Sequence, residues 1–229
     1  MASERKFGLA LLVCTLLFCG CQSGRAKVKE VPRTPTDKKK AELLKRIDRK
    51  FEDAEAHYEL GTMYQADGLW SQAEYEYNTT LSFDPVHRGA QAATVKVLME
   101  SGDTNKSHDY VDIYMNQTSN SAYDSLQLAM AFQKHGLDKY SLDCYQQALR
   151  LAPSSYRVNR QIGYYYLSKG NQEEAKNYLS RSFQINANQP EVAGELGRLG
   201  VAVKIPRKVE KQTTKIDKMA EPSGKEIKK

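Results

Sequence analysis

The chain has 229 residues, with 34 basic and 28 acidic side chains and a net charge of +6. This length allows one sizeable domain with tails, and 40% hydrophobic with 27% charged residues suits a helical globular protein. Three of the four cysteines lie between residues 14 and 21. If this stretch is a signal that is removed and its last cysteine carries a lipid, Cys144 has no intramolecular partner and no disulfide framework is expected.

The first 20 residues have the features of a secretory signal. Arg5 and Lys6 form a charged start, and residues 7–18 are an almost wholly apolar run. Such a run is too short to span a bilayer comfortably as a permanent helix. We therefore expect residues 1–20 to be a signal peptide.

The end of this run resembles a bacterial lipoprotein signal. In "FCGC", residues 18–21, Gly20 directly precedes Cys21, as a small residue precedes the acylated cysteine of that family. Phe18 and Cys19 depart mildly from the family pattern. The resemblance implies a covalent lipid, such as palmitate, on Cys21. An uncleaved anchor or an ordinary signal cut nearby is the alternative.

The resemblance also implies a location. A lipidated mature chain lies outside the cytoplasm, in the bacterial cell envelope, so nucleic acid is not an expected partner despite a pI of about 9.0. Gln22, rather than Asp, follows Cys21. By resemblance to enterobacterial sorting, this points to the periplasmic face of the outer membrane.

The next segments are expected to be a tether and a helix. Residues 21–36 contain two prolines and are predicted to be a flexible tether. Residues 37–53 are predicted to form a capping helix with Thr36 or Asp37 as its N-cap. Its apolar residues follow helical spacing: Leu43, Leu44, Ile47 and Phe51. This helix could cover the neighbouring repeat or lie on anionic lipid, and the covering role is favoured.

A period of 34 residues organises the middle of the chain. Glycine recurs at this period: Gly68, Gly102, Gly136 and Gly170. Small side chains mostly stand seven residues before each glycine: Gly61, Val95, Ala129 and Gly163. Small side chains also stand five residues after each: Ala73, Ser107, Ser141 and Ala175. Such columns predict helical hairpins, because small residues let two helices approach closely and glycine accepts the positive φ that ends the first helix.

The stretch "LGTMYQADGLWSQAEYEYNTTLSFDP" resembles the tetratricopeptide repeat, with its Leu-Gly, Tyr, Ala, aromatic residue and final Pro. The resemblance covers residues 54–189 in four units: 54–87, 88–121, 122–155 and 156–189. In the second unit Thr94-Val95 replaces Leu-Gly and Ser119 replaces Pro. The implied fold is an all-α solenoid of four hairpins with N- and C-terminal capping helices.

The C-terminal segments differ in charge from the repeats. Residues 190–203 are predicted to be a capping helix that begins at Pro190. Residues 204–229 are predicted to be a basic disordered tail. Residues 54–203 carry 12 basic and 17 acidic side chains, whereas residues 204–229 carry 9 basic and 4 acidic ones.

No constellation typical of catalysis appears in the sequence. The four histidines are scattered over the units and are interpreted as surface or packing residues: His57, His87, His108 and His135. The stretch "GDTNKS", residues 102–107, lacks the second glycine of a phosphate loop and falls on a repeat turn. We therefore expect no enzyme, no metal and no cofactor other than the lipid on Cys21.

The family resemblance implies a binding groove lined by the first helix of each hairpin. By register, the groove residues are Tyr58, Thr62, Gln65, Lys96, Met99, Tyr123, Gln127, Met130, Gln133, Arg160 and Tyr164. Tyr and Met at such positions suit a peptide partner. Tyr58 and Thr62 stand where the family's carboxylate-clamp pair would begin, so this clamp is not expected.

These features predict a membrane-anchored protein–protein interaction scaffold of the cell envelope that binds a partner protein or peptide in the groove. The combination of lipidated cysteine and repeats resembles pilotin lipoproteins of type IV pili and related secretion systems, although those carry more repeats. Two alternatives stay open. The chain could bind anionic lipid or wall polymer through its basic arms, which are the segments before and after the repeats. It could also be a regulatory subunit of a cell-wall enzyme.

Overall fold

A computed structural model of the chain describes residues 34–204. The signal, Cys21, most of the tether and the tail from residue 205 lie outside this range. The described residues form ten helices and no strand: α1 Pro35–Arg49, α2 Ala54–Ala66, α3 Trp70–Phe83, α4 Arg88–Ser101, α5 Thr104–Thr118, α6 Ala122–Lys134, α7 Asp138–Leu151, α8 Tyr156–Ser168, α9 Gln172–Ile185 and α10 Pro190–Arg198. The all-α prediction is confirmed.

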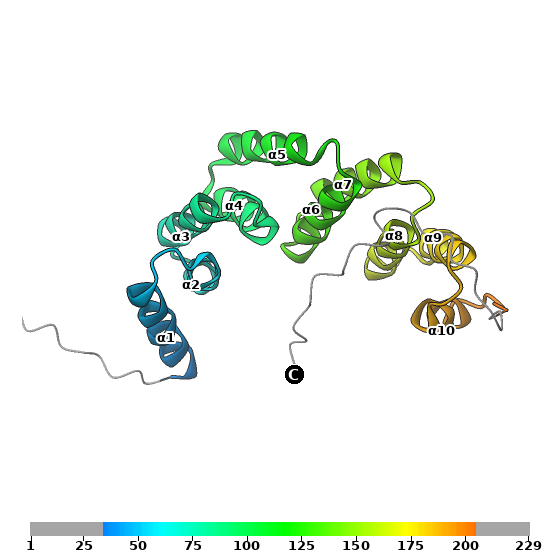
Figure 1. Ribbon diagram of the computed structural model, residues 1–229, viewed down its shortest axis with the longest axis horizontal. Helices are drawn as coiled ribbons and strands as arrows, with labels where there is room; N and C mark the ends of the chain where they lie inside the picture. Colours follow the sequence, from blue (N-terminus) through cyan, green and yellow to red (C-terminus); the bar gives the residue numbers. More distant parts are fainter. Residues whose placement is uncertain (1–33, 205–229) are drawn as a thin grey trace, which may run out of the picture.

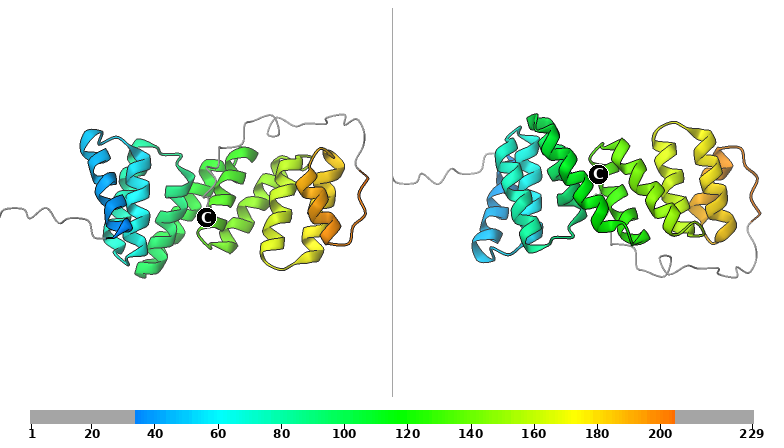
Figure 2. Two further views of the ribbon diagram at one scale, coloured as in Figure 1. Left: turned by 90° about the horizontal axis from the view of Figure 1, so that it is seen from below. Right: turned by 90° about the horizontal axis from the view of Figure 1, so that it is seen from above.

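The helices form an arch. The first helices of the hairpins, α2, α4, α6 and α8, lie on its inner side, and the second helices α3, α5, α7 and α9 lie on its outer side (Figure 1). Views from below and above show the hairpins following one another along the long axis (Figure 2). This arrangement is the predicted solenoid of four hairpins.

Each hairpin turns at its glycine. The four periodic glycines have φ angles between 71° and 92°: Gly68, Gly102, Gly136 and Gly170. Only this left-handed backbone lets the following amide return to the end of the first helix; in the first unit, Leu69 N–H donates to the Tyr64 carbonyl at 2.9 Å. The glycine period therefore marks the turns, as predicted.

The close approach of the two helices explains why small residues stand seven positions before each turn glycine. A Cβ atom on Gly61 would lie 2.6 Å from Tyr77 Cε1, and one on Gly163 would lie 2.6 Å from Leu179 Cγ. Real Cβ atoms do not come so near, so these positions tolerate no side chain without a shift of the facing residue. The rings and methyls of the second helix thus fill the space that glycine leaves.

The second unit packs differently from the others. Thr80 Oγ1 donates to the Ala54 carbonyl at 3.3 Å, and Ser182 Oγ donates to the Tyr156 carbonyl at 2.8 Å, each within its own hairpin. The corresponding residue of the second unit is Tyr114, and its buried hydroxyl does not make this hydrogen bond across the hairpin. A large ring therefore stands where the other units have a small side chain.

A second polar side chain of this unit also lacks the hydrogen bond that its counterpart makes. Ser141 Oγ in the third unit donates to the Ala129 carbonyl at 2.9 Å, whereas the corresponding Ser107 Oγ is buried without a partner. Figure 1 shows α5 side-on across the top of the arch, unlike the obliquely seen helices around it. The large Tyr114 side chain on α5 takes the place of the small residue of the other units, and this overpacking accounts for the changed packing of the hairpin.

The two end helices cover the array. On α10, Val192 and Leu196 are buried against Leu179 and Phe183. On α1, Leu43 is buried against Ala56 and Leu60 of α2. The helix α1 thus packs onto the first hairpin as a cover.

The expected start of α1 is wrong by two residues. Thr34, not Thr36 or Asp37, is the N-cap, and its hydroxyl accepts the Asp37 amide at 3.0 Å. The Asp37 carboxylate accepts the Thr34 amide in return, which completes a capping box. Pro35, assigned to the tether, is the first residue of the helix, where its missing N–H costs nothing.

Candidate functional site: the inner face of the arch

The eleven predicted groove residues all lie on the first helices of the hairpins. Their exposure varies widely: Met99 is exposed, Tyr58 is buried, and the other nine are half-buried. The inner face is therefore a partly filled surface rather than a row of free side chains.

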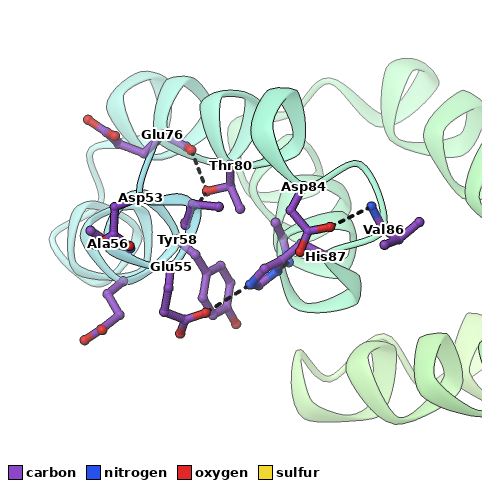
Figure 3. A network of polar contacts seen from close by, with 12 residues as sticks. Asp53, Glu55, Ala56, Tyr58, Glu76, Thr80, Asp84, Val86 and His87 are labelled. Carbon is purple, nitrogen blue, oxygen red and sulfur yellow. Dashed lines mark hydrogen bonds and ion pairs between the residues drawn. The ribbon is translucent and has the colours of Figure 1, made fainter. Parts of the chain in front are cut away.

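Tyr58 departs from the expectation of an open groove residue, because it is only 9% exposed. Its ring lies beside the His87 ring, 4.6 Å between centroids (Figure 3). It also lies over Gly89 of α4. A Cβ atom on Gly89 would come within 3.0 Å of the Tyr58 ring. Tyr58 is thus part of the packing between the first two units.

The Tyr58 hydroxyl also reaches the third unit, where its oxygen lies 3.5 Å from His135 Nε2. Burial, and then the charges of Lys134 and Lys96, lower the pKa of His135 to about 4, although Glu100 opposes them. A neutral ring at neutral pH has a nitrogen that can accept this hydroxyl. His87 and His135 therefore help to build the inner face, a role that their scattered positions in the sequence did not reveal.

Two predicted groove residues are used inside their own hairpins. Gln65 Oε1 accepts the Tyr77 hydroxyl at 2.7 Å, and Gln133 Oε1 accepts the Tyr145 hydroxyl at 2.6 Å. Each amide nitrogen also reaches the next unit: Gln65 Nε2 donates to Glu100, at 2.8 Å, and Gln133 Nε2 donates to Ser168, at 3.4 Å. These glutamines hold the array together, and the shared spacing of Gln and Tyr in units one and three is the signal that could have revealed it.

Charges of both signs alternate on the inner face. Lys96 pairs with Glu100 on α4, 3.5 Å apart, and Arg88 of α4 reaches Asp124 of α6 at 3.1 Å. The second pair links consecutive first helices. The inner face consequently lacks the single sign that would select a highly charged ligand.

Aromatic and methionine side chains remain accessible toward the C-terminal half of the face. Tyr123 and Met130 of α6 are half-buried and pack against the core of the middle units, while Tyr164 of α8 packs against the α9–α10 cluster. Burial raises the pKa of Tyr164. Two further predicted groove residues lie on these helices, Gln127 on α6 and Arg160 on α8. On α2, by contrast, the Thr62 hydroxyl is used within its own helix, where Oγ1 donates to the Glu59 carbonyl at 2.7 Å.

The described part of the chain offers little for metal or thiol chemistry. Within residues 34–204, no group of three or more His, Cys, Asp or Glu residues could hold a metal ion. Burial raises the pKa of the Cys144 thiol to about 12, which keeps it protonated. In the same range, no helix combines the length and the apolar character that crossing a bilayer requires.

No protein-family model and no curated protein match the sequence. Similar solved structures include PilF of Pseudomonas aeruginosa, with 24% identity, covering 66% of this chain and 69% of that one, at a TM-score of 0.37. TTC0263 of Thermus thermophilus, a tetratricopeptide protein, has 16% identity, covers 72% of this chain and 90% of that one, and gives a TM-score of 0.41.

YrrB, described as a tetratricopeptide protein with an unusual peptide-binding site, has 16% identity, covers 71% of this chain and 84% of that one, and gives a TM-score of 0.38. All these scores are low. The chain nevertheless has a tetratricopeptide-like fold, because its own helical hairpins, positive-φ turns and 34-residue period carry that assignment.

Proposed function

We propose that this protein is a non-catalytic interaction scaffold, held in the bacterial cell envelope by a lipid on Cys21, that binds a partner protein or peptide on the inner face of its arch. One observation carries the proposal. The first helices of the hairpins share one face of a curved array, and Tyr and Met side chains lie along it. Curved repeat arrays provide extended concave surfaces of this kind for binding.

The chemistry of the face suggests the chemistry of the ligand. Tyr123, Met130 and Tyr164 offer apolar area with adaptable polar tips, which suits a partner segment that is amphipathic. The pairs Lys96–Glu100 and Arg88–Asp124 leave no strong positive charge for an acidic ligand. The proposed ligand is therefore an amphipathic, not strongly acidic segment of about 10–20 residues, bound as a helix or in extended form.

The proposed cellular role is assembly of an envelope complex, such as a pilus or a secretion system. It is supported by the resemblance of a lipidated cysteine followed by tetratricopeptide units to pilotin lipoproteins. Cys21 and Gln22, on which anchoring and outer-membrane location depend, lie outside the described residues. They enter the proposal from the sequence alone.

A second candidate is a binder of anionic lipid or wall polymer. One observation favours it: the outward side of α1 exposes Lys38, Lys45 and Arg49, which form no ion pair with another described residue. Binding of that kind would weaken steeply with salt, whereas apolar contacts on the inner face would not.

The test is affinity capture from detergent-solubilised envelope with three forms of the protein. These are the intact chain, a chain truncated after Val203, and the double variant Tyr123→Ala/Tyr164→Ala. We expect the double variant to lose the partner and the truncated chain to keep it. Loss on truncation, with normal capture by the double variant, would instead support binding by the basic tail.

A further inference from the structure

We propose that the inner face binds its partner segment in extended form, and that the side-chain amides of Gln127 and Gln161 hydrogen-bond to the backbone of that segment. This binding mode rests on the function proposed above, which leaves open the conformation of the segment and its place along the arch. Gln161 is a new site residue, because the repeat register did not include it in the predicted groove.

The two glutamines occupy equivalent places on neighbouring first helices. Gln127 of α6 and Gln161 of α8 are 34 residues apart, which is the repeat period. Each lies on the side of its helix opposite the buried residues, three positions before a large half-buried side chain, Met130 on α6 and Tyr164 on α8. The two helices lie on the inner side of the arch, where a hydrogen bond links their C-terminal ends (Figure 1).

Both amides are available to a ligand. Gln127 and Gln161 are half-buried, and neither side chain forms a hydrogen bond with another residue of the chain. The buried polar atoms that lack a partner within residues 34–204 all belong to other residues, so these two amides reach the surface. The same holds for the hydroxyls of Tyr123 on α6 and Tyr164 on α8. Four uncharged hydrogen-bonding groups are therefore accessible on these two helices.

The first two units offer no equivalent of the two glutamines. In the same column they carry Glu59, which pairs with Lys39 and Arg46 of α1, and Ala93, which is buried. The polar groove residues of these units are used in the hydrogen bonds and the ion pair described above. A ligand that needs free polar groups consequently finds them on α6 and α8.

Free amide groups favour an extended ligand. A glutamine amide can donate to a carbonyl and accept from an N–H. In a helix the backbone N–H and C=O groups are paired with each other, whereas in an extended segment they are open to a partner. Gln127 and Gln161 can therefore bind the backbone of a segment that crosses from α6 to α8, while Met130 and Tyr164 contact its apolar side chains. None of these four side chains is charged, so a charged group of the ligand would gain no partner from them.

The test begins with a phage-displayed library of random peptides of about twelve residues, selected on the full chain with Cys21→Ser so that a lipid anchor does not interfere. One selected peptide is then synthesised with a fluorophore, and anisotropy measures its affinity. Gln127→Leu/Gln161→Leu should weaken binding by about fivefold or more, because both amides are lost. Gln146→Leu/Gln184→Leu, which changes two exposed glutamines of the outer helices α7 and α9, is the matched control and should keep the affinity. Circular dichroism checks that each variant is folded.

A second measurement tests the contact with the backbone. The backbone amides of the peptide are N-methylated one at a time, which removes one donor in each form. At least one methylated form should bind the unsubstituted glutamine protein about fivefold more weakly than the parent peptide. The same methylation should cost less than about twofold in Gln127→Leu/Gln161→Leu, because the partner of that donor is already missing.

The outcomes separate this binding mode from the proposed function. If no peptide is selected, or if Tyr123→Ala/Tyr164→Ala binds the selected peptide normally, the inner face is not the peptide site and both are overturned. If that variant loses the peptide while Gln127→Leu/Gln161→Leu keeps it, only the glutamine contact is overturned. Equal losses on N-methylation in both proteins would likewise overturn the extended binding mode and leave the proposed function standing.

Discussion

His57 Nδ1 lies 2.6 Å from Glu76 Oε2, and the two side chains join α2 to α3 inside the first hairpin. His57 Nε2 lies 2.9 Å from the Phe51 carbonyl oxygen, and because a carbonyl only accepts, this nitrogen carries a proton and donates it. One buried ring thus ties the loop after α1 to both helices of the first hairpin. The interpretation of His57 as a packing residue omitted this polar role.

Glu76→Ala should lower the free energy of unfolding by about 2–4 kcal/mol, because it leaves the buried His57 ring without its partner. Urea unfolding followed by circular dichroism measures it. Glu55→Ala is the matched control: it removes the largely exposed partner of His87, 3.3 Å away, and should change stability by less than about 0.5 kcal/mol. Equal effects of the two substitutions would refute the structural role of the buried pair.

Folding stability should fall in acid partly through His135. Its pKa is about 4 in the folded chain against an ordinary value of 6.5, so between these values the unfolded chain binds a proton that the folded chain does not. Stability is therefore lost as the pH falls from about 6.5 toward 4, by about 1–3 kcal/mol for this group.

The measurement compares unfolding free energies at about pH 7.5 and about pH 4.5, on either side of most of this titration, in the wild type and in His135→Gln. The variant should lose less stability on acidification. His108→Gln, at an exposed position whose Nδ1 lies 2.8 Å from the Tyr140 hydroxyl, serves as the control and should retain the wild-type loss. An unchanged loss in His135→Gln would show that another group is responsible.

Gly61→Ala should destabilise the protein by about 1–3 kcal/mol, because the new methyl group meets the Tyr77 ring at 2.6 Å. Gly194→Ala offers the opposite case within a helix. No atom lies within 4 Å of a Cβ there, so this substitution should stabilise by up to about 1 kcal/mol through backbone entropy. Thermal unfolding midpoints that move in the same direction for both would contradict the close packing at Gly61.

Two tyrosine-to-phenylalanine substitutions should change the free energy of unfolding by amounts that differ in sign or size. Tyr77→Phe removes the hydrogen bond to Gln65 and should cost about 1 kcal/mol. Tyr114→Phe removes a buried hydroxyl that lies near Thr94 but forms no hydrogen bond of normal geometry, and it should be neutral or stabilising by up to about 1 kcal/mol. Chemical unfolding of both variants decides this, and an equal loss would mean that Tyr114 has a partner in solution.

If Cys21 carries the proposed lipid, Cys21→Ser should abolish acylation and release the protein into soluble extracts, because acyl chains would supply the membrane affinity. Cys19→Ser, two residues away, should do neither. Intact-mass measurement of the mature protein is the readout. A mature N-terminus elsewhere than Cys21, without the mass of acyl chains, would disprove the anchor.

The hairpins and their turns could be predicted from the residues alone. The 34-residue period, the glycines that turn each hairpin and the small columns depend on contacts within one unit, between residues close in the chain. Such local contacts repeat with the sequence, which is why the roles of Gly68 and Gly61 can be predicted from the residues alone. The start of α1 was missed because Pro35 indicates both a loop and a first helical residue, and only the Thr34 capping box distinguishes them.

Which side chains of the inner face remain available depends on contacts between units. Tyr58 stands at a groove position, yet it packs over Gly89 and reaches His135, 77 residues further along the chain. Gln65 likewise stands at a groove position, yet its amide nitrogen donates to Glu100 of the next unit. Contacts between units depend on how the helices cross, and this angle follows from the summed volumes of many side chains, which no single column of the repeat records.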